Sequence, residues 1–477
     1  MNTLQQSFRG SALALAGLSL SACLTLGSNY SRPEMKLPGK YDGTTTGTPA
    51  PISDTWWKAF GDPALDRLMD EAVAANQDLA AAAARVEESR ALYGETQAER
   101  YPEVYLGFSG TRSKLSQQTS QLPPTADLTT TRVRATANLA YEFDFWGRYA
   151  NASKAARAEL VASEAGRRSV LVALQSDVVD AYIDLLAFDH QLAVTRRTSD
   201  SRVDSVKLQQ VRYDAGSISE LDLAQAQAEL ATTEAAAPAL QILIRQTEDR
   251  LAVLLGRIGG EIARAPETQL TLPEVPAGLP SDLLTRRADV AAAEQHLVAQ
   301  HALIAVARAG YFPSISLTAF GGSESKDLAG LFSTPTNIWQ AAASLLQPIF
   351  QAGKVTRQVE AARAREKQAL AGYAKTVQTA FAEVEDSLAA RALGTVRREA
   401  LARQVEALDR ARRLASLRYE AGDSSYLEVL DAERSLFQAE LQLSGARRDE
   451  LQAAVTLFKS LGGGWPASAA TAPAPQQ

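Results

Sequence analysis

Side chains that commonly carry out chemistry are sparse in this chain of 477 residues, which has three histidines and one cysteine. His296 and His301 lie five positions apart, whereas helical metal ligands usually lie three or four apart. The sequence contains no glycine-rich phosphate loop, no Gly-x-Ser-x-Gly turn and no cluster of cysteines and histidines. We therefore assign His190, His296 and His301 structural or solvent-facing roles, and expect neither a metal site nor an enzyme.

The single cysteine, Cys23, is placed for covalent attachment of lipid. It follows a short apolar run at 11–20, and Leu20 to Cys23 (LSAC) resemble the lipobox of bacterial lipoproteins. The run is too short to cross a bilayer, so residues 1–22 are predicted to be a cleaved signal peptide. The resemblance implies a diacylglycerol group and an N-acyl chain on Cys23, and Leu24 in place of an aspartate favours the outer membrane. The alternative is an unmodified, buried cysteine.

Charge and hydropathy exclude two further classes of protein. The formal charge is −6, and it becomes −7 when residues 1–22, with their one basic residue, are removed. Nucleic acid is therefore not an expected partner, because its phosphates are bound by Lys and Arg. After the signal peptide no apolar stretch approaches the roughly 18 residues of a membrane helix. Any further membrane crossing must use strands.

The elements that position functional side chains occur twice, because the sequence repeats at an offset of 206 residues. Arg212 to Gly216 (RYDAG) align with Arg418 to Gly422 (RYEAG), and Leu255-Gly256 aligns with Leu461-Gly462. With five more residues of offset, Tyr101-Pro102 aligns with Phe312-Pro313. The chain is predicted to be a tandem duplication.

Each repeat predicts a helix, a strand hairpin, a long helix and a returning helix. Alternation of apolar and polar residues at about 104–111 and 132–144 indicates strands. Apolar residues from Leu171 to Leu192 recur at steps of three and four, which predicts a heptad seam on the long helix. The returning helix and the helix before the hairpin together match the long helix in length, so we expect them to stack end to end. The predicted bounds are 103–145 (hairpin), 147–211 (long helix) and 218–256 (returning helix) in the first repeat (76–256), and 314–350, 353–417 and 426–461 in the second (288–462).

Four strands cannot close a membrane barrel, because the smallest barrels have eight and open edges do not survive in lipid. The protein must then oligomerise through its strands. Two copies would give eight strands and a filled interior, whereas three would give twelve and a lumen. The alternative is two ordinary hairpins on a soluble core, since alternation is a weak indication of membrane strands.

Several motifs follow one another along nearly the whole mature chain: Leu20 to Cys23, Trp56 to Pro63 (WWKAFGDP), Tyr141 to Arg148 (YEFDFWGR), Pro348 to Phe350, both Arg-Tyr-x-x-Gly turns and Leu461 to Trp465. In order and spacing they resemble the outer-membrane factor family, the TolC-like efflux proteins, and its OprM/NodT-type lipoprotein branch. The resemblance implies a mainly α fold with membrane β, a TolC-like trimeric α/β-barrel with a periplasmic helical tunnel. It also implies an equatorial collar drawn from 23–75, 257–287 and the C-terminal end, where 463–477 are predicted to be a disordered tail.

The same resemblance implies function and partners. The homotrimer would be the passive exit duct of a tripartite efflux system for drugs or other small molecules. An inner-membrane pump, of the resistance-nodulation-division type, would drive it through a periplasmic adaptor, a membrane fusion protein. Two alternatives stay open: export of proteins or peptides, and a structural periplasmic coiled-coil lipoprotein, which would leave the strands unexplained.

The turns and the last helix carry the predicted functional residues. The turns would form the periplasmic tip where the adaptor docks, although the motif could equally be a plain helix stop ending in a left-handed glycine. The family places a leucine and an aspartate at the channel constriction, and these match Leu427 and Asp431, four apart on one helix face. Three Asp431 carboxylates near the axis of a trimer would favour cations, and Gln225 replaces the acid in the first repeat. The turn residues are Arg212, Tyr213, Gly216, Arg418, Tyr419 and Gly422.

Overall fold

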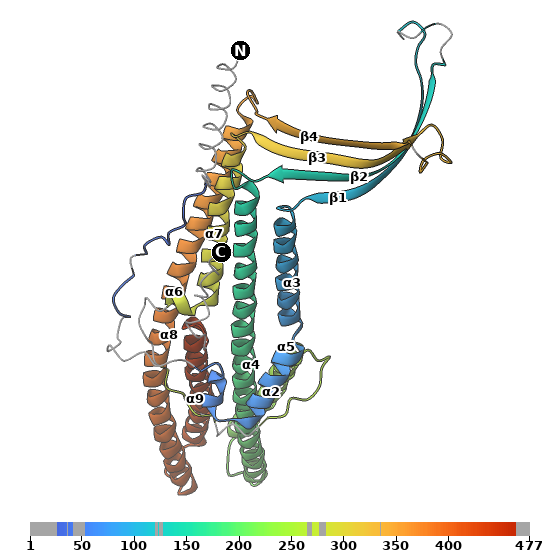
Figure 1. Cartoon of the computed structure of the whole chain (residues 1–477). Helices are drawn as coiled ribbons and strands as arrows, with labels where there is room; N and C mark the ends of the chain where they lie inside the picture. Colours follow the sequence, from blue (N-terminus) through green and yellow to red (C-terminus); the bar gives the residue numbers. More distant parts are fainter. Residues whose placement is uncertain are drawn as a thin grey trace. The chain divides into compact units, whose positions relative to one another are not determined.

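The computed structural model describes residues 26–35, 37–41, 53–119, 123, 127–264, 270–275, 283–333 and 335–463. The predicted signal peptide, Cys23, Leu24 and all but one residue of the predicted tail lie outside this part. The described chain is mainly helical with one antiparallel sheet, as predicted (Figure 1). The elements are η1 (Trp56–Phe60), α2 (Pro63–Ala75), α3 (Gln77–Ala98), β1 (Glu103–Lys114), β2 (Thr129–Phe143), α4 (Arg148–Asp214), α5 (Glu220–Leu254), α6 (Leu283–Arg286), α7 (Ala288–Ala309), β3 (Ser314–Ser325), β4 (Asn337–Leu346), α8 (Lys354–Glu420) and α9 (Tyr426–Ser460).

The chain divides into two compact units. One comprises residues up to 33 together with 87–162 and 294–372, and contains the sheet. The other comprises 34–86, 163–293 and 373–477, and contains η1, α2, α5, α6 and α9. Both long helices, α4 and α8, contribute a segment to each unit.

The sheet has the strand order β1-β2-β3-β4, so the central β2–β3 pair joins the two repeats. The register lines up apolar residues on one face across all four strands: Leu106 pairs with Ala137, Ala137 with Gly321, and Gly321 with Trp339. Leu106 is 87% exposed and Trp339 is 81% exposed. Within the described chain, β1 and β4 are edge strands with a strand neighbour on one side only.

The strands are longer than the alternation of apolar residues predicts. Residues 112–114 of β1 and 129–131 of β2 extend the strands beyond the predicted 104–111 and 132–144. Beside this extension, Glu324 of β3 forms ion pairs with Arg134 at 2.7 Å and with Arg132 at 3.2 Å on β2. Hydrophobic alternation misses such a segment because neither of its faces is apolar.

The long helices each run for 67 residues, three residues past the predicted ends at 211 and 417. The predicted seam of α4 is buried at Leu174, Val178, Ala181 and Leu185, and Leu171 and Phe188 pack against the same core. Pro238 lies inside α5, and the helix continues on both sides of it. No helix in the described part of the chain is both long and apolar enough to cross a lipid bilayer.

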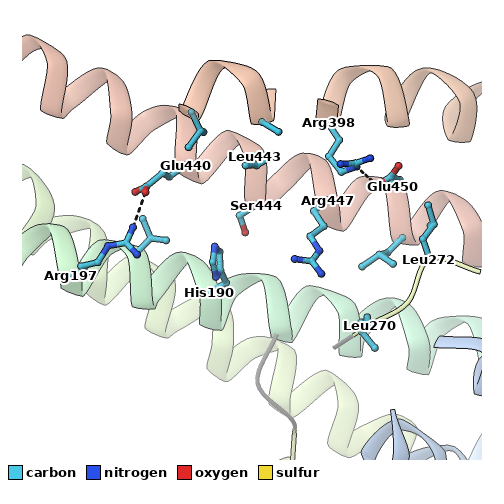
Figure 2. A pocket seen from close by; sticks show the side chains of 14 residues that line it. His190, Arg197, Leu270, Leu272, Arg398, Glu440, Leu443, Ser444, Arg447 and Glu450 are labelled. Carbon is cyan, nitrogen blue, oxygen red and sulfur yellow. Dashed lines mark hydrogen bonds and ion pairs between the residues drawn. The ribbon is translucent and has the colours of Figure 1, made fainter. Parts of the chain in front are cut away.

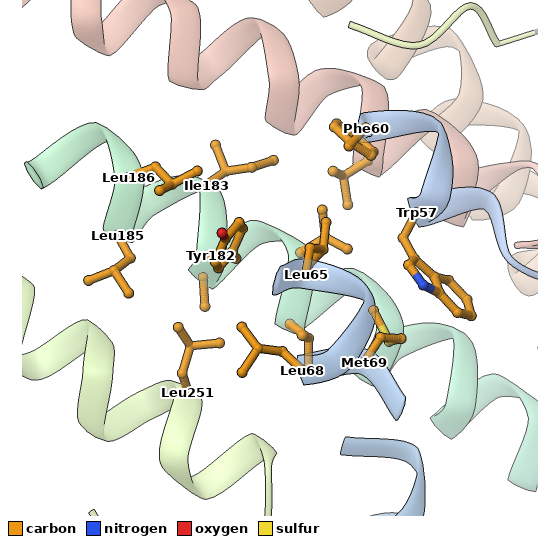
Figure 3. Packing of buried hydrophobic residues seen from close by; sticks show 14 of the residues in the cluster. Trp57, Phe60, Leu65, Leu68, Met69, Tyr182, Ile183, Leu185, Leu186 and Leu251 are labelled. Carbon is orange, nitrogen blue, oxygen red and sulfur yellow. The ribbon is translucent and has the colours of Figure 1, made fainter. Parts of the chain in front are cut away.

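The segment 56–75, predicted to belong to the collar, supplies much of the core of the second unit. Trp56 stacks on Phe458 of α9, with ring centroids 4.9 Å apart. The buried Asp62 caps α2 through Ala64 N–H at 2.8 Å and accepts a 2.6 Å hydrogen bond from the Tyr182 hydroxyl of α4. Figure 3 shows the side chains of η1, α2, α4 and α5 meeting in this cluster.

The returning helices end against the start of the helices before the hairpins, as end-to-end stacking requires. Asn76 donates to the Leu254 carbonyl at 3.0 Å, and Arg287 donates to the equivalent Ser460 carbonyl at 3.1 Å. A Cβ on Gly256 would lie 2.4 Å from the Ala75 carbonyl oxygen, so only glycine permits this approach.

Candidate functional site

The two predicted tip turns have the same backbone geometry. Gly216 and Gly422 have φ values of 70° and 80°, in the left-handed region, as predicted. Ser217 N–H donates to the Arg212 carbonyl and Asp423 N–H to the Arg418 carbonyl, which is the six-to-one hydrogen bond of a Schellman motif. The motif therefore does stop both long helices, and this geometry alone does not assign adaptor docking.

The two turns also contact each other. The Arg212 guanidinium lies over the Tyr419 ring, 5.0 Å from its centroid. The Tyr419 hydroxyl donates to Gln209 at 3.1 Å, and its ring lies 5.2 Å from that of Tyr426. Tyr213 is instead exposed and is the turn aromatic most available to a partner. The predicted residues thus form one joined surface that includes both repeats.

The start of the returning helix differs between the repeats. In the first, Ser219 and Asp222 form a reciprocal capping box on α5. In the second, Ser425 makes no side-chain cap to α9, and Glu428, which aligns with Asp222, pairs with Arg418 at 3.1 Å. The second repeat therefore lacks a side-chain cap that typically contributes about 1 kcal/mol.

Both predicted gate residues are exposed on the first turns of α9. The Leu427 and Asp431 side chains are on the surface, and that of Asp431 is 71% exposed. An Asp431 oxygen lies 3.2 Å from Arg434, whose guanidinium also lies 3.9 Å from Glu229 of α5. Asp431 and Arg434 are three residues apart on a helix, and this spacing alone predicts an ion pair between them. The carboxylate of the predicted gate residue Asp431 therefore lies near a positive charge.

A buried arginine lies behind this surface, and sequence patterning does not indicate it. Arg202 of α4 is 4% exposed, donates to the Glu229 carbonyl at 2.6 Å and pairs with the Glu229 carboxylate at 3.1 Å. Burial raises the pKa of Glu433 on α9, while Arg202 opposes that shift. Burial also raises the pKa of Tyr426 to about 12. A polar cluster therefore joins α4, α5 and α9 beside the gate residues.

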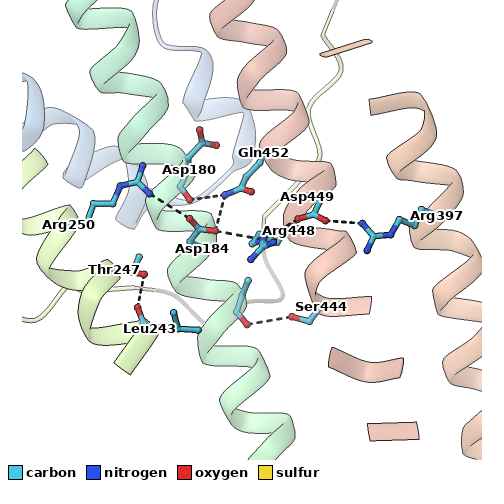
Figure 4. A network of polar contacts seen from close by, with 11 residues as sticks. Asp180, Asp184, Leu243, Thr247, Arg250, Arg397, Ser444, Arg448, Asp449 and Gln452 are labelled. Carbon is cyan, nitrogen blue, oxygen red and sulfur yellow. Dashed lines mark hydrogen bonds and ion pairs between the residues drawn. The ribbon is translucent and has the colours of Figure 1, made fainter. Parts of the chain in front are cut away.

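A second polar network lies further along α4 (Figure 4). Asp184 accepts from Gln452 at 2.9 Å and lies within 3.8 Å of Arg250 and Arg448. Asp180, one turn away, has a buried carboxylate oxygen with no hydrogen-bond partner among the described residues. Burial, together with the charges of Asp184 and Asp177, raises its pKa to about 7.

A cavity of about 570 Å³ lies among α4, α8, α9 and residues 270–272 (Figure 2). Two of its arginines are paired with glutamates: Arg197 with Glu440 at 2.8 Å, and Arg398 with the buried Glu450 at 2.7 Å. His190 also lines this cavity. The charges in it link neighbouring helices.

The other two histidines have separate carboxylate partners. His296 lies 2.7 Å from Glu159, and this hydrogen bond raises the pKa of His296. His301 lies 2.6 Å from Glu366. Among the residues described, no three metal-ligating side chains gather into a candidate metal site.

Comparison with known proteins agrees with this architecture. The family model "Outer membrane efflux protein" matches residues 68–257 and 279–463, one block for each repeat. The solvent efflux pump outer membrane protein SrpC of Pseudomonas putida is 40% identical over 86% of this chain and 87% of its own length. The antibiotic efflux pump outer membrane protein ArpC of Pseudomonas putida is 36% identical over 95% of each chain. The outer-membrane channel OprN is 30% identical and superposes with a TM-score of 0.86, over 92% of this chain and 99% of that one. The chain therefore belongs to the outer membrane efflux protein family.

Proposed function

We propose that three copies of this outer-membrane protein join through β1 and β4 to form the exit duct of a tripartite efflux system. The observation that carries this proposal is the four-stranded sheet, whose two edge strands have a strand neighbour on one side only within the described chain. Unsatisfied backbone groups in lipid cost several kcal/mol each. Three such sheets supply twelve strands, enough to enclose a lumen.

The duct is passive, and its partners are an adaptor at the tip turns and an inner-membrane pump of the resistance-nodulation-division type. The exposed Tyr213 beside the joined turns supports the docking role. Solvents and antibiotics, for which the relatives are named, favour small molecules over proteins or peptides as cargo. Transport through such a duct requires no catalytic step, so we assign no enzymatic activity.

The mature N-terminus carries a diacylglyceryl group and an N-linked acyl chain on Cys23. The Leu20 to Cys23 motif supports this. Cells grown with labelled palmitate should label the wild-type protein but not the Cys23→Ser variant. Equal labelling of the two would remove the lipid assignment.

Electrical recording tests the duct itself. Purified full-length protein in a planar bilayer should give discrete conductance steps that favour cations. A bilayer that contains the protein but shows no steps would contradict the proposed duct.

A further inference from the structure

The N-terminal segment packs on α7 and α8 within the unit that contains the sheet. The Ser28 hydroxyl and carbonyl lie 3.0 Å and 3.1 Å from His301 Nε2, and His301 Nδ1 lies 2.6 Å from Glu366. Arg32 makes a bidentate ion pair with the Glu294 carboxylate, with N···O distances of 2.7 Å and 2.6 Å. These contacts hold Ser28 and Arg32, which follow Cys23 by five and nine residues in the sequence.

A cavity of about 230 Å³ lies where this segment meets the two helices. Leu26, Ile304 and Ala305 give it an apolar side. Three cationic side chains, those of Arg308, Arg363 and Lys367, also line it. Within the described part of the chain, no hydrogen bond or ion pair joins any of these side chains to another residue. The only carboxylate in the lining, Glu366, is held by His301.

The first repeat shows that packing of these helices does not require the cations. Arg308 aligns with Gln97, and Lys367 aligns with Val161. The first repeat therefore keeps only one of the three, Arg157 in the place of Arg363. Arg308 and Lys367 are therefore specific to the second repeat, whose Glu294 and His301 contact the N-terminal segment.

The residues that hold the N-terminal segment are specific to the second repeat as well. His301 and Glu294 align with Arg90 and Ala83. Ala83 could not reproduce the contact to Arg32, because it has no carboxylate. The cations and the N-terminal contacts therefore occur together.

We propose that this cavity binds the phosphate of an anionic glycerophospholipid headgroup beside the acylated N-terminus. Cys23 precedes Leu26 by three residues in the sequence, so a lipid on Cys23 is tethered to a lining residue of the cavity by a chain that spans at most about 11 Å. This step rests on the acylation of Cys23 proposed above. The guanidinium groups and the ammonium are suited to a phosphate, and the apolar side is suited to the first carbons of the lipid.

Native mass spectrometry of the purified full-length protein tests the site. Dioleoylphosphatidylglycerol, dioleoylphosphatidylcholine and inorganic phosphate are titrated separately. The double variant Arg308→Gln/Lys367→Val carries the first repeat's own residues, so its helices should pack normally. It should bind the phosphatidylglycerol about 25-fold more weakly, because each of the two cations removed contributes about fivefold in affinity for an anionic lipid.

Arg365→Gln is the matched control, because it removes one cation from an exposed position of α8 that does not line the cavity. It should bind the lipid as wild type does. Equal binding by wild type and the double variant would overturn the site. So would equal binding of phosphatidylcholine, or binding of inorganic phosphate without binding of phosphatidylglycerol.

Conductance recorded on the same preparations separates this site from the proposed duct. The double variant should keep wild-type conductance while it loses lipid affinity. Absent conductance with normal lipid binding would refute only the duct. Normal conductance with unchanged lipid binding in the double variant would refute only this site.

Discussion

At the scale of single residues, the predicted gate position holds a pair of charges rather than an isolated acid. Asp431 lies 3.2 Å from Arg434, so the carboxylate is partly compensated even in one chain. In the first repeat the aligned residue is Gln225, which carries no charge. A trimer would then bring three carboxylates and three guanidinium groups to the constriction, not six carboxylates.

Replacing Asp431 with alanine should raise single-channel conductance by roughly twofold and reduce the preference for cations, because it removes the acids and leaves Arg434 with only its 3.9 Å contact to Glu229. Recordings in a salt gradient measure both quantities. Gln225→Ala is the control at the same position of the first repeat and should leave both unchanged. If Asp431→Ala matches wild type in both quantities, the gate assignment is wrong.

Asp180 provides a pH-dependent contribution to stability. Burial first, and then Asp184 and Asp177, raise its pKa to about 7, while Lys459 and Arg250 lower it. The folded protein therefore holds this proton at pH values where the unfolded chain, with an ordinary pKa near 3.8, has released it. Its contribution is fully present below that lower value and is lost as the pH rises through about 7.

The neutral variant Asp180→Asn should therefore melt above wild type, and the difference should be larger at pH 8 than at pH 5. The widening should be a few degrees, given about 2–4 °C per kcal/mol for a domain of moderate size. Thermal scans at one fixed rate measure it. Asp184→Asn, which loses contacts to Gln452, Arg250 and Arg448, should instead melt lower at both pH values. A difference for Asp180→Asn that does not change with pH would contradict the assignment.

At the scale of elements, the strands combine one apolar and one polar face. Leu106 belongs to the apolar row that continues through Ala137, whereas Ser109 pairs with Arg134 on the opposite face. We expect the apolar face to meet lipid and the polar face to line the lumen. Alternation in the sequence predicts this division, but the pairing of β2 with β3 is between strands far apart in the chain and has no local sequence pattern.

Leu106→Arg should reduce the amount of assembled protein in the outer membrane severalfold, because an arginine on the lipid face costs about 2–4 kcal/mol near the bilayer midplane. Ser109→Arg places the same residue on the opposite face of the same strand and should assemble normally. Quantitative immunoblotting of outer-membrane fractions compares the two. Equal loss of assembled protein in both variants would contradict the assignment of the apolar face of β1 to lipid.

Both predicted tip turns end their helices whether or not a partner docks there. Docking is therefore tested only by a substitution that removes a side chain and leaves the backbone hydrogen bonds of the turn intact. Tyr213→Ala removes an exposed ring and leaves Gly216 and its hydrogen bonds in place. It should reduce adaptor recovered with the protein about tenfold without changing the melting temperature, since exposed aromatics are often binding hot spots. Unchanged adaptor recovery would leave the turns with a capping role alone.

At the scale of the whole molecule, the duplication, the long helices, the seam from Leu171 to Leu192 and the left-handed glycines could be predicted from sequence. The duplication is visible as a repeat at an offset of 206 residues, and each of the other features is encoded by neighbours within a few positions. Arg202, Asp180 and the polar ends of the strands could not. Burial of a charge depends on partners from other helices, such as Glu229 for Arg202, and no local pattern specifies them.

We propose that one chain supplies only part of a closed wall and that three chains complete it. Native mass spectrometry of the intact full-length channel, released from detergent, measures the number of copies directly. We predict three copies in each particle, with dissociation when the β1 edge is disrupted. A stable monomer or dimer that still conducts ions would contradict the trimeric duct.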